Sequence, residues 1–260
     1  MVRSGHIWAT ESRYMNDPRE FLHGAEVILA VVDRLLARKH APPILQEVRH
    51  NVDRHIREKM QNLRVFCACF CTSSDLLSQW RAYGDSGGGY AIGLDPKSLF
   101  GPTQPERPPL RTLLRVIYDR KQQERWVERW CKTIGSGRSS GNHAHFWRFF
   151  SEALIAFKNS GYSEEGEWRL VQFGRAWTGD VQWLHPVQFR ERKGQIIPYA
   201  DLDLAQSGSS KGGKLPISQI VAGPTQDAEL SDKALRLFVE DCGYGPDQVE
   251  LRRSIVPFRG

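Results

Sequence analysis

Residues 66–95, FCACFCTSSDLLSQWRAYGDSGGGYAIGLD, decide the fold that this sequence predicts. Residues 65–71 alternate apolar and small side chains, which indicates a strand, and a hydroxyl cluster at 72–74 follows its end. A second strand pattern occupies residues 90–94. Two strands separated by a polar, glycine-rich segment fit either the wall of a pocket or the core of an ordinary hairpin. The sequence leaves both interpretations open.

A short helix is expected between these two strands. It carries Trp80 and Tyr83 three residues apart, and Asp75 or one of the preceding hydroxyls is expected to cap its first turn. The glycines among residues 84–89 then break the helix. The pocket, if these pieces form one, would be built from the hydroxyl of Ser73, the aromatic pair and the glycine loop.

Composition and charge describe an ordinary globular chain. The 260 residues are 40% hydrophobic and 25% charged, and we expect a single domain over residues 1–260. The formal net charge is +6 and the sequence pI is about 9.1. This excess predicts weak attraction to phosphate-rich partners, although a mild positive charge spread over a solvated surface is the simpler interpretation.

Nothing in the sequence predicts insertion into a membrane. The longest apolar run, residues 27–36, contains Asp33 and Arg34 and is shorter than the roughly 20 residues that a spanning helix needs. The N-terminus has no apolar core followed by a small-residue cleavage site, as a signal peptide would. We therefore expect a cytoplasmic protein without a membrane partner.

The five cysteines predict neither disulfides nor a metal centre. Cys67, Cys69 and Cys71 alternate along one strand, so they share a face and are too rigidly spaced to bridge one another. They are expected to be small buried hydrophobes. Cysteine and histidine do not occur in pairs with turn-like spacing, so no metal is expected.

The rest of the chain interleaves helices with short strands, which predicts an α+β fold with a mixed, largely antiparallel sheet and flanking helices. Trp126 and Trp130 share one helical face and are expected to pack in the core. The expected helices are 21–38, 44–62, 121–133, 145–159 and 230–242; the expected strands are 6–10, 113–118, 181–184, 194–199, 215–222, 249–256 and one that begins near 167; the expected loops are 101–109, 135–142 and 207–213.

Two glutamates, Glu165 and Glu167, flank Gly166 just before an apolar strand pattern, and Arg169 follows. Strand alternation would place both glutamates on one face. Two carboxylates at a strand entry can share a site, with one positioned by a neighbour and the other catalytic. The alternative is a solvated acidic turn whose charges protect the strand edge from aggregation.

Lys158 lies nine residues before Glu167. It fits either a phosphate ligand or a charge placed favourably at a helix C-terminus. The chain contains neither a P-loop nor a nucleophile elbow, and no motif of sequence-specific nucleic-acid recognition emerges.

Several short motifs occur in a fixed order that covers nearly the whole chain. This order resembles a large, mostly bacterial family, domain-of-unknown-function family 2971, whose name implies no activity. The matching segments are Ile7-Trp8-Ala9, residues 16–20, Cys69 to Ser73, Trp80-x-x-Tyr83 with its glycine loop, residues 90–95, Lys158 with Glu165-x-Glu167-Trp168-Arg169, Ile197-Pro198-Tyr199, residues 217–224 and residues 253–259.

A second, weaker similarity implies an activity. A hydroxyl-bearing strand followed by aromatics, and later an E-x-E that enters a strand, is similar to the layout of ADP-ribosyltransferases, which use NAD as substrate. The resemblance implies that Glu167 contacts the nicotinamide ribose and stabilises an oxocarbenium-like transition state, and that Glu165 orients or activates the acceptor. It also implies that Ser73 braces the pocket and that Trp80 or Tyr83 lines the nicotinamide site.

The chain departs from that layout near its N-terminus. The usual first strand, whose tyrosine or basic residue holds NAD, is missing or compressed, and His6 is the nearest substitute, with Arg3 a weaker one. An N-terminal truncation or a misassigned start codon would impair NAD binding. The other expected ligand contacts are Asn16, Asp17, Lys158 and Arg169.

The leading hypothesis is an ADP-ribosyltransferase-like enzyme that cleaves NAD and transfers ADP-ribose to a protein or nucleic-acid acceptor, as a toxin or phage-defence effector. The alternative is a non-enzymatic nucleic-acid- or partner-binding module that uses the net positive charge and exposed aromatics. A third hypothesis is a hydrolase that uses the same glutamates on a nucleoside or glycosidic bond. The sequence defines neither the acceptor nor the oligomeric state.

Overall fold

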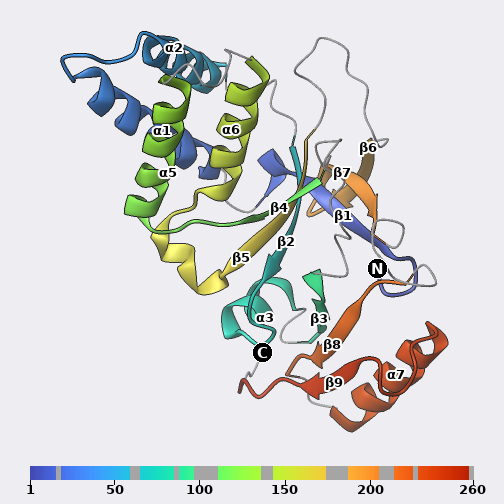
Figure 1. Ribbon diagram of the computed structural model, residues 1–260. Coiled ribbons are helices and arrows are strands. Elements are labelled where there is room, and N and C mark those ends of the chain that lie inside the picture. Colours follow the sequence, from blue (N-terminus) through green and yellow to red (C-terminus); the bar gives the residue numbers. More distant parts are fainter. Residues whose placement is uncertain are drawn as a thin grey trace. The chain divides into compact units, whose positions relative to one another are not determined.

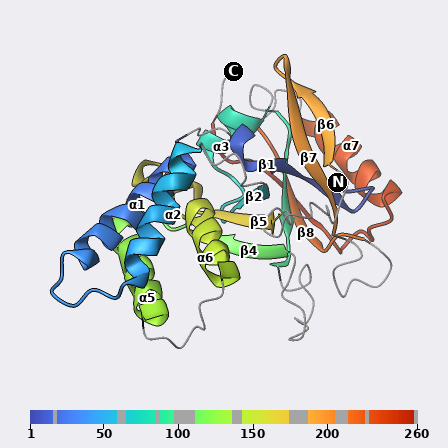
Figure 2. The same ribbon diagram turned by 90° about the horizontal axis from the view of Figure 1, so that it is seen from above.

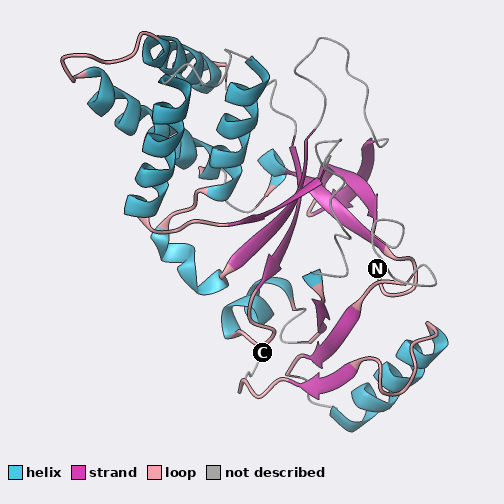
Figure 3. Cartoon of the chain, in the orientation of Figure 1, coloured by secondary structure: helices cyan, strands magenta, loops and turns pink. Residues whose placement is uncertain are grey.

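The computed structural model combines helices with largely antiparallel sheets, which confirms the predicted α+β class (Figures 1 and 3). It describes residues 1–15, 19–58, 65–84, 88–96, 111–135, 143–173, 187–204, 214–224 and 228–257. The chain divides into two compact units: unit 1 contains Met1–Trp8, Cys71–Pro109 and Asp201–Gly260, and unit 2 contains Ala9–Phe70 and Leu110–Ala200. The single domain expected over residues 1–260 stays a prediction.

A six-stranded sheet, in the order β4-β5-β2-β1-β7-β6, supplies the strands of unit 2. β1 pairs antiparallel with β2, β4 with β5, and β6 with β7. β6 was not predicted, and the strand expected at 181–184 lies outside the described residues. The strand bounds are β1 His6–Glu11, β2 Val65–Cys71, β4 Arg111–Arg115, β5 Glu167–Phe173, β6 Val187–Arg192 and β7 Gln195–Asp203, of which residues 9–11, 65–70 and 195–200 of β1, β2 and β7 belong to unit 2.

Four helices of unit 2 pack together around the main apolar core: α1 Glu20–Leu36, α2 Ile44–Arg57, α5 Arg120–Gly135 and α6 His143–Ala156 (Figure 2). α1 buries Ala25, Ile28, Val32 and Leu35, the spacing of one helical face. Gly24 marks the close approach of α1 to α6, because a Cβ at this position would lie 2.9 Å from the Cα of Leu154.

α5 presents one face to this core. It buries Gln123, Val127 and Cys131 at four-residue intervals. Next to them Trp126 and Trp130 stack on Phe149 of α6, with ring centroids 4.6 and 4.0 Å apart. Both tryptophans are partly buried against the core, which confirms the prediction that they serve packing.

Unit 1 contains a three-stranded sheet in the order β3-β8-β9. β3 pairs antiparallel with β8, and β8 pairs parallel with β9. Its core includes Ile220 and Val221 of β8 with Leu235 and Val239 of α7. The bounds are β3 Tyr90–Leu94, β8 Ile217–Ala222, β9 Glu250–Arg253, α3 Leu77–Tyr83 and α7 Ala228–Asp241.

Most predicted elements occur with shifted bounds. The strand expected at 113–118 ends at Arg115, and the helix expected at 44–62 ends at Arg57. Of the strand expected at 249–256, only Glu250–Arg253 forms a strand, β9. Residues 101–109, 136–142 and 207–213 of the expected loops lie outside the described residues. Within the part of the chain that the structure describes, no helix is both long and apolar enough to cross a membrane.

The stretch 66–95 does not form a hairpin. β2 belongs to the six-stranded sheet and β3 to the three-stranded one, so the hairpin interpretation is wrong. The expected helix cap is also absent, because α3 begins after Leu76 without a side-chain cap.

Asp75 accepts hydrogen bonds from other groups and not from the first backbone N–H groups of α3. Its carboxylate accepts hydrogen bonds from the Trp80 indole (2.6 Å), the Ser254 hydroxyl (2.6 Å) and the Ile255 amide (2.8 Å). Burial alone would raise the pKa of Asp75, but these three hydrogen bonds outweigh it and lower the pKa. Asp75 thus binds Ser254 and Ile255, which are distant in sequence, and does not cap the nearby helix.

The three cysteines of β2 do not share one environment. Cys67 is buried, whereas Cys69 and Cys71 are exposed, so the expectation of three buried hydrophobes is wrong for two of them. Residues 65–68 are buried on both faces of the strand, and burial falls from Cys69 onward. Alternation along the strand did not reveal where the layer that covers β2 ends.

Candidate functional site

The two predicted glutamates lie where a short 3-10 helix, η3 Ser160–Glu165, turns into β5. Gly166 joins them with φ 50° and ψ 44°, a left-handed conformation that favours glycine. Glu165 ends η3 and Glu167 begins β5, so the strand alternation expected for this pair does not apply. The glycine turn, rather than the strand, brings both carboxylates to the same lysine.

Lys158 links the two carboxylates. Its Nζ donates to Glu165 Oε2 at 2.6 Å and to Glu167 Oε2 at 2.9 Å. Only 9% of the lysine side chain is exposed, against 7% for Glu167 and 27% for Glu165. Lys158 therefore follows α6 as a buried bridge between one buried and one partly exposed carboxylate.

Arg169 holds Glu167 from the same face of β5. Its Nε donates to Glu167 Oε1 at 2.8 Å and its Nη2 to Oε2 at 2.9 Å, a bidentate pair. Nη1 donates to the carbonyl of Ile155 at 2.6 Å. The guanidinium is thus fixed by α6 as well as by the carboxylate. We call Lys158, Glu165, Glu167 and Arg169 the glutamate cluster.

The electrostatics of the glutamate cluster keep Glu167 ionised. Burial by itself would raise the pKa of Glu167, but the hydrogen bonds and charge of Arg169, together with the neighbouring Cys69 and the charge of Lys158, lower it to about 2. Burying charges is costly, and paired buried charges add little net stability. Because Glu167 is buried and paired, the interpretation of a solvated acidic turn fails for it, although that interpretation describes the exposed Glu164.

Cys69 touches the glutamate cluster, which its sequence position did not predict. Its thiol is close enough to Glu167 for the two side chains to interact electrostatically. Although the residue as a whole is exposed, desolvation around the sulfur and then the charge of Glu167 raise the pKa of the thiol well above its ordinary value. The neutral S–H form, a weak donor, is therefore the one beside Glu167.

Three further side chains position the glutamate cluster. Gln123 of α5, fully buried, donates to the carbonyls of Ile117 (2.6 Å) and Lys158 (3.0 Å). The backbone N–H of Glu167 donates to the Tyr118 hydroxyl at 3.0 Å. The ring of Tyr162 lies 4.8 Å from Lys158 Nζ. All three act through contacts between elements, and no spacing in the sequence signals them.

The other predicted site residues that the structure describes lie in unit 1. Trp80 is only 5% exposed and bonded to Asp75, whereas Tyr83 is 62% exposed. The carbonyl of Ser73 accepts from the Cys71 thiol. His6 lies between two acids of β7, with Nδ1 3.1 Å from Asp201 Oδ1 and Nε2 3.8 Å from Asp203 Oδ2. Asn16 and Asp17 lie outside the described residues.

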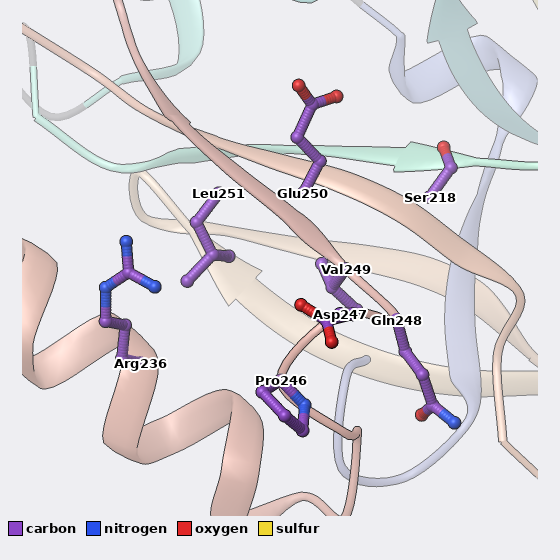
Figure 4. Close-up of a pocket in the computed structure, with 8 residues that line it drawn as sticks. All are labelled: Ser218, Arg236, Pro246, Asp247, Gln248, Val249, Glu250 and Leu251. Atoms are coloured by element: carbon purple, nitrogen blue, oxygen red, sulfur yellow. The ribbon is translucent and has the colours of Figure 1, made fainter.

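Two surface hollows lined by described residues of unit 1 contain none of the predicted site residues. One, of about 410 Å³, is lined by residues from α7, β8, β9 and the loop before β9: Ser218, Arg236, Pro246, Asp247, Gln248, Val249, Glu250 and Leu251 (Figure 4). A second, of about 250 Å³, has an almost entirely apolar lining. The first hollow carries charged side chains, Arg236, Asp247 and Glu250, but none of them belongs to the sites that the sequence predicts.

Among the described residues, no group of three or more histidine, cysteine or acidic side chains is placed to hold a metal ion.

Comparison with known families adds one match. Residues 79–170 match the family model Protein of unknown function (DUF2971). The matched segment, 92 of the 260 residues, begins within α3, ends in β5 and contains the whole glutamate cluster. No curated protein and no solved structure matches the chain. The resemblance to family 2971 is thus supported over this segment, and the similarity to ADP-ribosyltransferases has no support from these comparisons.

Proposed function

We propose that the glutamate cluster is the reaction centre of an enzyme that cleaves the N-glycosidic bond of NAD and transfers ADP-ribose to an acceptor. One observation carries the proposal. Two carboxylates of different exposure share a single ammonium, with Lys158 Nζ 2.6 Å from Glu165 and 2.9 Å from Glu167. Groups with perturbed pKa values, such as Glu167, are enriched at functional sites.

Glu167 has the properties that stabilise a developing positive charge. When the bond between the ribose carbon and nicotinamide breaks, nicotinamide leaves with the electron pair and the ribose becomes oxocarbenium-like. A carboxylate with a pKa of about 2 remains negative at neutral pH, and Arg169 holds it in place so that it need not reorganise. Glu167 would thus act through its fixed charge.

A ligand hydroxyl has one route to Glu167 that costs little. A carboxylate offers about four acceptor positions. Arg169 occupies two of those on Glu167 and Lys158 a third. Cys69 also lies beside Glu167, and although its sulfur is desolvated the residue as a whole is exposed. Because a thiol is a weak donor, a ribose hydroxyl that takes its place beside Glu167 would donate a stronger hydrogen bond to the carboxylate.

Glu165 fits the acceptor side of the reaction. Its side chain is 27% exposed, so a nucleophile can reach it more easily than Glu167. As the nucleophile bonds to the ribose carbon, its proton passes to the Glu165 carboxylate, and Lys158 neutralises the pair of acids meanwhile. The acceptor would be a protein, a nucleic acid or water, and a role as toxin or defence effector would follow from the first two.

Release of nicotinamide from millimolar NAD tests the proposal without knowledge of the acceptor, because water can accept ADP-ribose. The unaltered chain is expected to release nicotinamide, Glu167→Gln to abolish release, and Glu165→Gln to slow transfer. Glu164→Gln is the matched control, since it removes the same charge from an exposed position of η3. Release that persists unchanged in Glu167→Gln would refute the role of Glu167, and absence of NAD binding would refute the substrate.

A further inference from the structure

The outward face of α5 carries four exposed basic side chains in unit 2: Lys121, Arg125, Arg129 and Lys132. Their spacings of four, four and three residues place them on one side of the helix. This side is opposite the face that buries Gln123, Val127 and Cys131. We call these four residues the basic face of α5.

The acids of α5 are paired with bases other than those of the basic face. Glu124 accepts from Arg34 of α1 at 3.0 Å and from Arg120 at 2.9 Å, and Glu128 accepts from Arg34 at 2.8 Å. Both glutamates are partly buried. The other exposed residues of α5 are Arg120, Gln122, Thr133 and Gly135, so no exposed acid opposes the four bases on this helix.

No described residue forms an ion pair with any of the four bases. With five bases and two acids between Arg120 and Gly135, α5 has a net charge of +3, half of the formal +6 of the chain. The positive excess that the composition reports is thus concentrated on a helix rather than spread evenly. Unpaired like charges at i,i+4 repel and give the helix no stability of their own.

The chemistry of the basic face selects one class of partner. A helix that lies on a membrane needs large apolar residues beside its bases, and a protein interface needs apolar or aromatic anchors. The exposed side of α5 has neither. It offers only long, mobile cations over a length of about 17 Å, from the rise of about 1.5 Å per residue.

We infer that the basic face of α5 binds the phosphate backbone of nucleic acid without reading the bases. Duplex DNA carries a charge about every 1.7 Å of its axis, so several phosphates lie within reach of a face of that length. Lysine and arginine contacts of this kind position a protein but carry no sequence information. The inference does not rest on the catalytic proposal, because it uses no residue of the glutamate cluster.

The expected binding is weak and strongly dependent on salt. Fluorescence anisotropy with short labelled duplex DNA and RNA of mixed sequence is expected to give a Kd of about 10⁻⁴ to 10⁻⁶ M. If all four bases contact phosphates, the slope of log K against log salt on duplex DNA is about −3.6. Equal affinity for mixed sequences is also expected, because no contact reads a base edge.

The decisive variant replaces all four residues of the basic face with glutamine. Its matched control replaces Lys233, Arg236, Arg252 and Arg253, four exposed bases of unit 1, which removes the same net charge. The α5 variant is expected to lose affinity by about tenfold or more and to lose most of the salt slope, whereas the control keeps both. Thermal unfolding checks that both variants fold. If the quadruple variant does not fold, the single changes Arg125→Gln and Arg129→Gln replace it, and each is expected to reduce the salt slope by about one.

Three results would overturn the inference. The first is no detectable binding by the unaltered chain at low salt. The second is equal loss in the α5 variant and the unit 1 control, which would mean that net charge alone attracts the ligand. The third is binding to anionic lipid vesicles that is as tight as binding to nucleic acid, which would assign the face to a membrane surface.

Discussion

Unit 2 carries positive charge in two contrasting settings. Lys158 and Arg169 are buried, and each is bonded to a glutamate at 2.6–2.9 Å. The four bases of the α5 basic face are exposed and opposed by no acid on the exposed side of that helix. Buried, paired charges are fixed and little affected by salt, which suits chemistry at one atom. Exposed, unpaired charges act over a distance and are screened, which suits the capture of a polyanion.

The largest difference between the two settings is expected in stability. Arg169→Met leaves Glu167 as a buried charge without its bidentate partner, so urea unfolding should show a loss of about 3–5 kcal/mol. Arg129→Met removes the same charge from the basic face and should change the free energy of unfolding by less than about 0.5 kcal/mol. Similar losses in the two variants would erase the contrast.

Acid should weaken the glutamate cluster in a defined range. The pKa of Glu167 falls from 4.5 to about 2 on folding, which corresponds to on the order of 3 kcal/mol. Because the folded pKa is the lower one, this stabilisation is present above about pH 4.5 and is lost as the pH falls through 2. The stability difference between the unaltered chain and Glu167→Gln should therefore shrink over that range. A gap that stays constant down to pH 2 would contradict the assigned ionisation.

α5 contributes to both settings: its buried face carries Gln123, which contacts Lys158, and its exposed side carries the basic face. Gln123→Met removes the amide that holds the carbonyls of Ile117 and Lys158, at an expected cost of about 1–3 kcal/mol. The neighbouring Gln122→Met, on the exposed side, should stay within about 0.5 kcal/mol. Thermal unfolding of both variants measures the difference. Equal midpoints would mean that Gln123 does not position Lys158.

The smallest effect concerns Cys69 and appears in kinetics rather than stability. If a ribose hydroxyl replaces the thiol on Glu167, Cys69→Ser introduces a stronger competitor and should raise the KM for NAD a few-fold with little change in kcat. Cys69→Ala removes the competitor and should not raise KM. A fall in kcat with KM unchanged in both variants would show that the ligand does not enter at this position.

Local patterns in the sequence predicted much of the fold and part of the candidate site. Helical periodicity indicated α1, α5 and α7, and the sequence singled out Lys158, Glu165, Glu167 and Arg169, although it did not predict that Lys158 pairs with both glutamates. The helices could be predicted because the periodicity that defines each of them lies within one element. Even so, the reason given for Glu165 and Glu167 was wrong, since the left-handed Gly166 and not strand alternation brings them together.

Contacts between distant elements could not be predicted. Cys69 on β2, Gln123 on α5 and Tyr118 before α5 reach the glutamate cluster only through packing. The same reason explains why residues 66–95 looked like a hairpin, because each strand pattern was correct but their partner strands lie elsewhere in the chain. The four bases of α5 are visible in the sequence, whereas the pairing of Glu124 and Glu128 with Arg34 is not.

The most direct test measures nicotinamide release and DNA affinity in two variants, Glu167→Gln and the quadruple glutamine variant of the α5 basic face. It asks whether the buried charges carry the chemistry and the exposed charges carry the binding of nucleic acid. Glu167→Gln should lose nicotinamide release and keep its affinity for DNA. The α5 variant should keep release and lose affinity. Nicotinamide release that is absent from the unaltered chain, or that Glu167→Gln and the control Glu164→Gln retain equally, would contradict the assignment of chemistry to the buried charges.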